Sequence, residues 1–260
     1  MSDPISLAAL LPDGISPHHV LAIGAIALIA GAARGFSGFG SALIFMPLAS
    51  TFAAPSLVAG LLLVIDSIAA VPLIPDAFKQ ADRRPVTAMV LGATIGVPIG
   101  TYALTRLDPV VTRWIISAFV VAMLALIASG WRYRGTDRGG IAAAIGSVSG
   151  FCGGLAQTGG PPVVAYWLGR PIAPQVVRAN IVLFFAGSDV VSVASYLVAG
   201  LLTADVLKLA LLIGPVFASG LWLGARMFGK ASETLFRAIC YALIALAAVV
   251  GLPLFDGVLR

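Results

Sequence analysis

A glycine-rich phrase that occurs twice constrains the fold of this chain more than any other feature. It reads GFSGFG at residues 35–40 in the first half and GFCGG at residues 150–154 in the second. Pro47 and Pro162 each follow the first glycine of a copy by twelve residues. Because several glycines within a short stretch weaken a helix, we expect each phrase to interrupt one.

Composition places both phrases inside a lipid bilayer. The chain has 260 residues, of which 60% are hydrophobic and only 10% are charged, and its mean hydropathy is +1.04. A soluble domain needs more charge than this to cover its surface. An interrupted helix at membrane depth, present once in each half of a chain, is typical of the binding site of a transporter.

The apolar runs predict an all-α polytopic membrane protein with five helices in each half. In the first half the predicted helices are Val20–Ala33, Ser41–Phe52, Ser56–Ile74, Val86–Leu104 and Val110–Ser129. In the second half they are Ile141–Gly150, Pro161–Leu168, Ala179–Leu197, Asp205–Phe228 and Thr234–Val250. A helix needs about 20 residues to cross the hydrocarbon core, so the second helix of each half is too short to cross. We divide the chain into an N-terminal lead-in at 1–19, a first membrane repeat at 20–131, a linker at 132–138 and a second membrane repeat at 139–260.

The two halves match each other at fixed sequence offsets, which predicts an internal duplication. Gly35, Gly38 and Pro47 recur 115 residues later as Gly150, Gly153 and Pro162. Gly96, Gly100 and Arg113 recur 124 residues later as Gly220, Gly224 and Arg237. The second set contains small-xxx-small pairs, which let helices approach closely in lipid.

The basic residues predict that the two repeats have opposite orientations. If the short helix of each half returns to the face where its hairpin began, three further spans remain, and an odd number of spans inverts the next half. In that arrangement most of the 16 lysines and arginines fall on one side of the membrane. They are Lys79, Arg83, Arg84, Arg132, Arg134, Arg138, Arg170, Arg178, Arg226, Lys230 and Arg237. The positive-inside rule makes this side cytoplasmic and places both termini outside. The predicted fold is therefore two inverted-topology repeats, each with a broken or re-entrant helix hairpin plus three spanning helices.

Arg34 stands directly before the first glycine phrase, far from any polar loop. An arginine at membrane depth is costly unless it is paired, which favours a functional role. Its planar guanidinium could bind a substrate anion through two parallel hydrogen bonds. Alternatively, it could extend to the outer interface or pair with an aspartate.

Asp66 and Asp189 lie near the middle of two predicted spans, 123 residues apart. Either carboxylate could relay protons, or could instead pair with Arg34 or Arg178. We predict that both aspartates act in coupling or gating. Asn180, near the start of its predicted helix, is a weaker candidate for a gate.

The glycine phrases also predict an anion site between the repeats. They would free backbone N–H groups at the start of each short helix, where the helix dipole favours anions. The alternative is that the glycines serve only close helix packing. The predicted substrate-binding residues are Arg34, Gly35, Ser37, Gly38, Gly40, Ser41, Gly153, Gly154, Gln157, Thr158, Gly159 and Gly160.

The sequence contains no pattern typical of an enzyme. It has no metal-binding motif of His and Glu, no Ser–His–Asp set with suitable spacing and no nucleotide-binding loop. We therefore expect no enzymatic activity, no cofactor and no metal. The net charge of +5 comes from short clusters between apolar segments, as in the inward loops of a membrane protein, so we expect no nucleic-acid partner.

The duplicated arrangement, with its phrases at Gly35–Pro47 and Gly150–Pro162, resembles the TauE/SafE family of sulfite and organosulfonate exporters. The resemblance covers nearly the whole chain. It implies a multi-pass transporter in a bacterial inner membrane, with small sulfur-containing or carboxylated anions such as sulfite or sulfoacetate as substrates.

The combined prediction is a secondary transporter that exports a small sulfur-containing anion by alternating access. A membrane potential that is negative inside drives anions outward by about 2.3 kcal/mol per charge per 100 mV, without a coupling ion. The alternatives are an anion channel and a proton-coupled importer of small carboxylates. The expected partners are the small anion and the lipid bilayer, and H+ coupling and a homodimer stay open.

Overall fold

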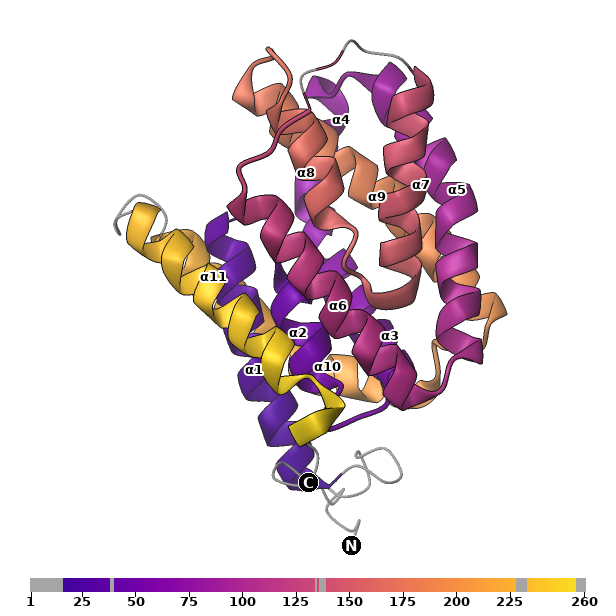
Figure 1. Cartoon of the computed structure of the whole chain (residues 1–260), viewed down its shortest axis with the longest axis vertical. Coiled ribbons are helices and arrows are strands. Elements are labelled where there is room, and N and C mark those ends of the chain that lie inside the picture. The colour runs from indigo at the N-terminus through magenta and orange to yellow at the C-terminus, as the bar shows by residue number, and fades with distance from the viewer. Residues whose placement is uncertain (1–15, 38–39, 134, 136–138, 228–232, 256–260) are drawn as a thin grey trace, which may run out of the picture.

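The computed structural model describes residues 16–37, 40–133, 135, 139–227 and 233–255. Within these residues the regular elements are all helices (Figure 1). The first half contains α1 (Pro17–Ser37), α2 (Ser41–Ala49), α3 (Pro55–Ala70), η2 (Val71–Leu73), α4 (Ile74–Gln80), α5 (Arg83–Arg106) and α6 (Pro109–Ala128). The second half contains α7 (Gly139–Ala156), α8 (Gly160–Leu168), α9 (Pro174–Val198), α10 (Ala204–Met227), α11 (Glu233–Val250) and η3 (Pro253–Phe255).

Seven segments of the described chain are long and apolar enough to cross a membrane, so this is a multi-pass membrane protein. They are α1, the continuous run Pro55–Gln80, α5, α6, α7, α9 and α10. The run Pro55–Gln80 extends past the predicted end at Ile74, because Pro72 and Pro75 lie in the first turns of η2 and α4. Proline is tolerated in the first turn of a helix, because the N–H that proline lacks would have no hydrogen-bond partner there.

The short helices α2 and α8 have nine residues each. A helix of that length extends about 14 Å at 1.5 Å per residue, which is less than half of a hydrocarbon core about 30 Å thick. Each short helix therefore cannot cross a membrane, as predicted. Helix α2 is nevertheless buried along nearly its whole length, among α1, α3, α6 and α11.

The prediction that each glycine phrase interrupts a helix is confirmed for the first phrase and wrong for the second. Residues 35–37 belong to the last turn of α1, and the whole phrase at 150–154 lies within α7. The second break comes later, between Ala156 and Gly160, and the first comes between Ser37 and Ser41. Gly35, Gly150 and Gly154 stay helical and form the contact surface with a neighbouring helix, which is the packing alternative considered above.

Two pairs of helices pack with their backbones in direct contact. A Cβ atom on Gly35 of α1 would lie 2.0 Å from the carbonyl oxygen of Leu221 in α10. Likewise, a Cβ atom on Gly96 of α5 would lie 1.9 Å from the carbonyl oxygen of Ser147 in α7. Only glycine fits at such positions, as is typical where helices associate in lipid. Another face of α5 exposes Leu91, Ile95 and Ile99, each by more than half, as an apolar stripe.

The contacts of these two pairs recur between the halves. Gly31 and Gly35 approach Phe217 and Leu221, and Gly146 and Gly150 approach Met89 and Ala93 in the same register. Gly220 and Gly224 approach Leu28 and Ala32, and Gly92 and Gly96 approach Ala143 and Ser147. The offset from α1 to α7 is 115 residues, as predicted. The offset from α5 to α10 is 128 residues, one helical turn from the predicted 124, so Gly220 corresponds to Gly92 in its contacts.

This packing builds two helix bundles, each from both halves of the chain (Figure 1). The first bundle has a core formed mainly by α1, α2, α3, α6, α10 and α11. The second bundle has a core formed mainly by α5, α7, α8 and α9. Helices α3 and α9 contact each other where the two bundles meet.

Candidate functional site

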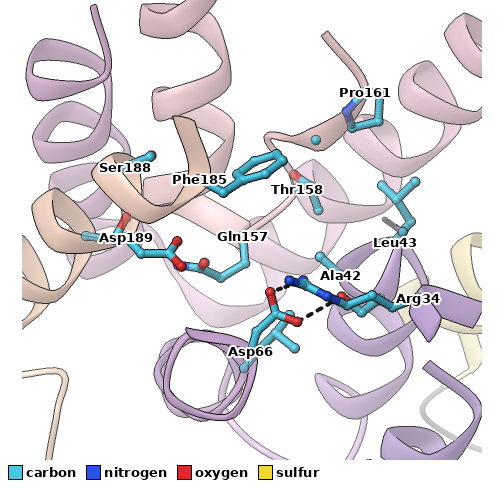
Figure 2. Close-up of a pocket in the computed structure, with 15 residues that line it drawn as sticks. Arg34, Ala42, Leu43, Asp66, Gln157, Thr158, Pro161, Phe185, Ser188 and Asp189 are labelled. Carbon is cyan, nitrogen blue, oxygen red and sulfur yellow. Dashed lines mark hydrogen bonds and ion pairs between the residues drawn. The ribbon is translucent and has the colours of Figure 1, made fainter. Parts of the chain in front are cut away.

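A small cavity of about 70 Å³ lies between the two bundles (Figure 2). The first bundle lines it with the end of α1, the start of α2 and the middle of α3. The second bundle lines it with the link from α7 to α8 and one face of α9. The lining residues are Arg34, Gly40, Ser41, Ala42, Leu43, Leu62, Asp66, Gln157, Thr158, Gly160, Pro161, Phe185, Ser188, Asp189 and Ser192.

Arg34 and Asp66 form an ion pair on the wall of this cavity (Figure 2). The guanidinium Nη1 of Arg34, in the last turns of α1, donates to Oδ2 of Asp66 on α3. Ser41, the first residue of α2, donates its hydroxyl to Asp66 Oδ1 at 3.4 Å. The side chains of the pair are 20% and 22% exposed, so the cavity reaches both. Of the alternatives for Arg34, pairing with an aspartate is confirmed, whereas Arg178 lies exposed on α9 outside the cavity.

Asp189 brings a second carboxylate to the same cavity. Its Oδ2 accepts a hydrogen bond of 2.9 Å from the hydroxyl of Ser67, which connects α9 to α3. Within the described residues Asp189 has no ion pair. The cavity therefore holds one cationic side chain and two carboxylates, with hydroxyl and amide groups around them.

The link from α7 to α8 is held in a fixed shape by its own hydrogen bonds. Gln157 has a positive φ of 56°, which is uncommon for a residue with a side chain. Its amide donates to the Tyr196 hydroxyl at 3.2 Å, and that hydroxyl donates to the Gly154 carbonyl at 2.9 Å. At the other end of the link, the Ser149 hydroxyl donates to the Gly159 carbonyl at 2.5 Å. The link thus presents Gln157 to the cavity on a supported backbone.

Several residues of the predicted site line this cavity together. They are Arg34, Gly40, Ser41, Gln157, Thr158 and Gly160, with the two predicted coupling residues Asp66 and Asp189. Gly40 has φ 95° and directly precedes α2, where only glycine adopts the turn without strain. The side chain of Ser37 and the whole of Gly38 lie outside the described residues.

Other predicted residues do not line the cavity. Gly35 and Gly154 pack against the backbones of α10 and α5, so their missing side chains serve helix contact. Gly153 faces open space, and Gly159 packs against Ser149. Asn180 is fully buried away from the cavity, and its Oδ1 accepts a hydrogen bond of 2.7 Å from the backbone N–H of Asp82, just before α5.

Sequence reasoning missed one wall of the cavity. Phe185, Ser188 and Ser192 line it beside Asp189, at the spacing that places residues on one face of a helix. Ser192 lies three residues after Asp189 and four after Ser188, so a search for polar residues at this spacing along α9 would have found the wall. Leu62 occupies the corresponding place one turn before Asp66 on α3.

The chemical groups of the cavity suit ion binding and hydrogen bonding. A family model described as "Sulfite exporter TauE/SafE" matches residues 23–251 of the chain. The chain belongs to this family. Neither the curated proteins nor the solved structures that were compared with the chain gave a match. TauE/SafE proteins are membrane transporters and not enzymes, which agrees with the seven apolar segments and with the Arg34 cavity between the bundles.

Proposed function

We propose that this TauE/SafE protein is a secondary transporter that exports a small sulfur-containing anion through the cavity between its two bundles. The observation that carries the proposal is Arg34, an arginine at membrane depth whose guanidinium reaches a small polar cavity. A buried or half-buried arginine in a membrane marks a substrate or ion pathway by default. Sulfite and short sulfonates have several oxygens that can accept two parallel hydrogen bonds from a guanidinium.

The size of the cavity favours small anions. About 70 Å³ gives room for a few water molecules or for one anion of comparable size. Sulfite therefore fits our proposal better than long-chain sulfonates do. The side-chain hydroxyl of Ser41 and the amide of Gln157 lie on facing walls and would donate hydrogen bonds to its oxygens.

We propose that alternating access moves one bundle against the other. Support comes from the backbone contacts between α1 and α10 and between α5 and α7, which hold each bundle together across the two halves. The cavity and the Ser67–Asp189 hydrogen bond lie between the bundles, where such a movement would act. The recurring glycine contacts also support the proposal that the halves are inverted repeats, with both termini on the outer side of a bacterial inner membrane.

The membrane potential gives the direction of transport in this proposal. With the inside negative, each negative charge that moves outward gains about 2.3 kcal/mol per 100 mV. Export of an anion that carries net charge thus needs no other energy source. Import would need cotransported cations, for which Asp66 or Asp189 would be the binding group in the cavity.

Flux of labelled sulfite, sulfoacetate and small carboxylates in proteoliposomes tests the proposal. We expect Arg34→Ala to reduce sulfite flux about 10- to 100-fold, because a hydrogen-bonded charge contributes about 1.5–3 kcal/mol. The control is Arg106→Ala, which removes an exposed arginine at the end of α5, outside the cavity. Unchanged flux in Arg34→Ala would contradict the site.

The same assay separates the alternatives. A channel would show flux that does not saturate and no acceleration by substrate on the opposite side. A proton-coupled importer would accumulate carboxylates when the outside is acidified. Absence of flux for every anion would exclude the proposed function.

A further inference from the structure

The charges in the cavity pose a problem for an anion site. Arg34 is the cationic group that lines it, and its guanidinium already donates to Asp66. Asp189 adds a second carboxylate on the opposite wall. An anion that enters this arrangement meets a neutralised arginine and further negative charge, which repel it.

We propose that Asp66 is an internal competitor for the substrate. Its carboxylate holds the place on Arg34 that a substrate anion takes, and the anion binds when Asp66 accepts a proton and releases the guanidinium. The proton comes from the water on the side to which the cavity is open. It leaves with the anion on the other side, as Asp66 ionises again and returns to Arg34, so each cycle moves one proton with the anion. Sulfite in its doubly charged form then still carries net negative charge outward, as the proposed export requires. This inference rests on the proposed function, because it takes the cavity as the substrate site.

The position of Asp66 supports this competition. Asp66 and Arg34 both line the cavity and are both partly exposed, so the pair can exchange partners without unfolding either helix. The Ser41 hydroxyl contacts Asp66 from the start of α2, at the place where we expect substrate oxygens. A hydroxyl can also accept, so Ser41 can bond to Asp66 in either protonation state.

Few other charged groups face Asp66. Arg34 approaches from α1 and Asp189 from α9, while the residues that α2 and the α7–α8 link bring to the cavity are all neutral. Helix α10 also packs on α3, and its charged residues in the described chain stand at its two ends. They are Asp205, Lys208 and Arg226. Among the described residues, Asp66 and Asp189 are therefore the groups of this cavity that can bind a proton.

The two aspartates differ in their roles. Asp66 neutralises the arginine, whereas Asp189 bonds to Ser67 and has no ion pair within the described residues. Removing the charge of Asp66 frees the guanidinium, but removing the charge of Asp189 leaves the Arg34–Asp66 pair in place. The two substitutions therefore have different consequences for anion binding.

The test measures binding of sulfite and methanesulfonate to the purified full chain in lipid nanodiscs. Methanesulfonate is included because it keeps a single negative charge over the whole pH range used. From about pH 8 to about pH 5.5 we expect wild-type affinity to increase, by at most about tenfold per pH unit for one proton taken up. Asp66→Asn should bind methanesulfonate about tenfold more tightly than wild type at pH 8, and its affinity should change less with pH than that of wild type. Asp205→Asn is the control, since it removes an exposed carboxylate outside the cavity and should keep the wild-type pH profile.

A second measurement uses the wild type alone and so does not depend on folding of the variant. Methanesulfonate binding in weak buffer should take up about one proton per anion, which a pH indicator detects. Binding without proton uptake would overturn the proposal. So would an Asp66→Asn protein that binds no more tightly than wild type and keeps its pH dependence, because Asp66 would then serve only to neutralise Arg34. If neither anion binds to wild type or to Asp66→Asn at any pH, the proposed function fails as well, and the inference fails with it.

Discussion

The hydroxyl of Ser67 donates a hydrogen bond of 2.9 Å to the carboxylate of Asp189, and this bond joins α3 of the first bundle to α9 of the second. Both residues are half-buried beside the cavity. Ser67 directly follows Asp66, so the residue that pairs with Arg34 and the residue that bonds to the other bundle are neighbours on one helix. Movement of α3 would therefore change both contacts.

We predict that Ser67→Ala speeds the conformational change that opens the cavity alternately to the two sides of the membrane. A polar contact between membrane helices contributes about 0.6 kcal/mol on average and up to about 1.7 kcal/mol, so we expect sulfite flux at saturation to rise about 3- to 20-fold. Ser219→Ala is a matched control, because that hydroxyl is exposed and bonds to Val216 of its own helix. A saturated flux equal to or below that of wild type would contradict a restraining role for the Ser67–Asp189 bond.

A second prediction concerns the backbone contact between α5 and α7. The Cβ of Gly96→Ala would lie 1.9 Å from the carbonyl oxygen of Ser147, and backbone atoms on both sides leave little room to adjust. Overpacking of this kind costs about 1–3 kcal/mol or more, so we expect a clear loss of thermal stability and of monodisperse yield.

Gly24→Ala is the control for that substitution. Gly24 lies in α1 with nothing within 4 Å of an added Cβ, and alanine favours a helix over glycine by about 0.5–1 kcal/mol. We expect this variant to be as stable as wild type or more stable. Equal melting temperatures for Gly96→Ala and wild type would show that the two helices do not pack as described.

The same glycines explain how far the sequence predicts this fold. Apolar runs fix the number and approximate limits of the helices, because burial in lipid depends on composition over about 20 residues. The apolar runs do not distinguish a glycine that ends a helix from a glycine that packs against a neighbouring helix, because glycine lowers helix propensity equally in both places. Gly150 and Gly154 pack against α5, and α7 stays helical through both residues because α5 covers the face on which they lie.

The sequence predicts the site residues whose side chains are charged, because charge is rare in a membrane helix. A charge at membrane depth identified Arg34, Asp66 and Asp189, and all three line one cavity. Which aspartate pairs with Arg34 depends on how α1 and α3 are placed relative to each other, which the sequence does not encode locally. The polar wall with Ser188 and Ser192 was missed because serine is tolerated in any membrane helix and carries no charge to draw attention.

Asn180 provides a third prediction, on a residue that the sequence indicated as a gate. Its Oδ1 accepts from the Asp82 N–H at 2.7 Å and so caps the start of α5. We expect Asn180→Ala to lower the free energy of unfolding by about 0.5–1.5 kcal/mol, because the hydrogen bond to the Asp82 N–H is lost. Sulfite affinity should stay at the wild-type value, since Asn180 does not line the cavity. A transport defect in a variant of wild-type stability would instead support a gating role.

The last prediction uses Gly160 to test the size limit of the substrate. Gly160 is the first residue of α8 and lines the cavity. Outside its own helix, the atom nearest to an added Cβ would be Cζ of Phe185 at 3.9 Å, which is ordinary van der Waals contact. Gly160→Ala should therefore fold with wild-type stability or better, while its methyl group takes space from a cavity of only about 70 Å³. We expect transport of the larger sulfoacetate to fall about tenfold and transport of sulfite to fall less, because the larger anion has no room to shift away from the methyl group.

Gly153→Ala is the control for the Gly160→Ala variant, since Gly153 faces open space outside the cavity. If Gly160→Ala reduced sulfite and sulfoacetate transport by the same factor, the cavity would not be the place where anions are selected by size.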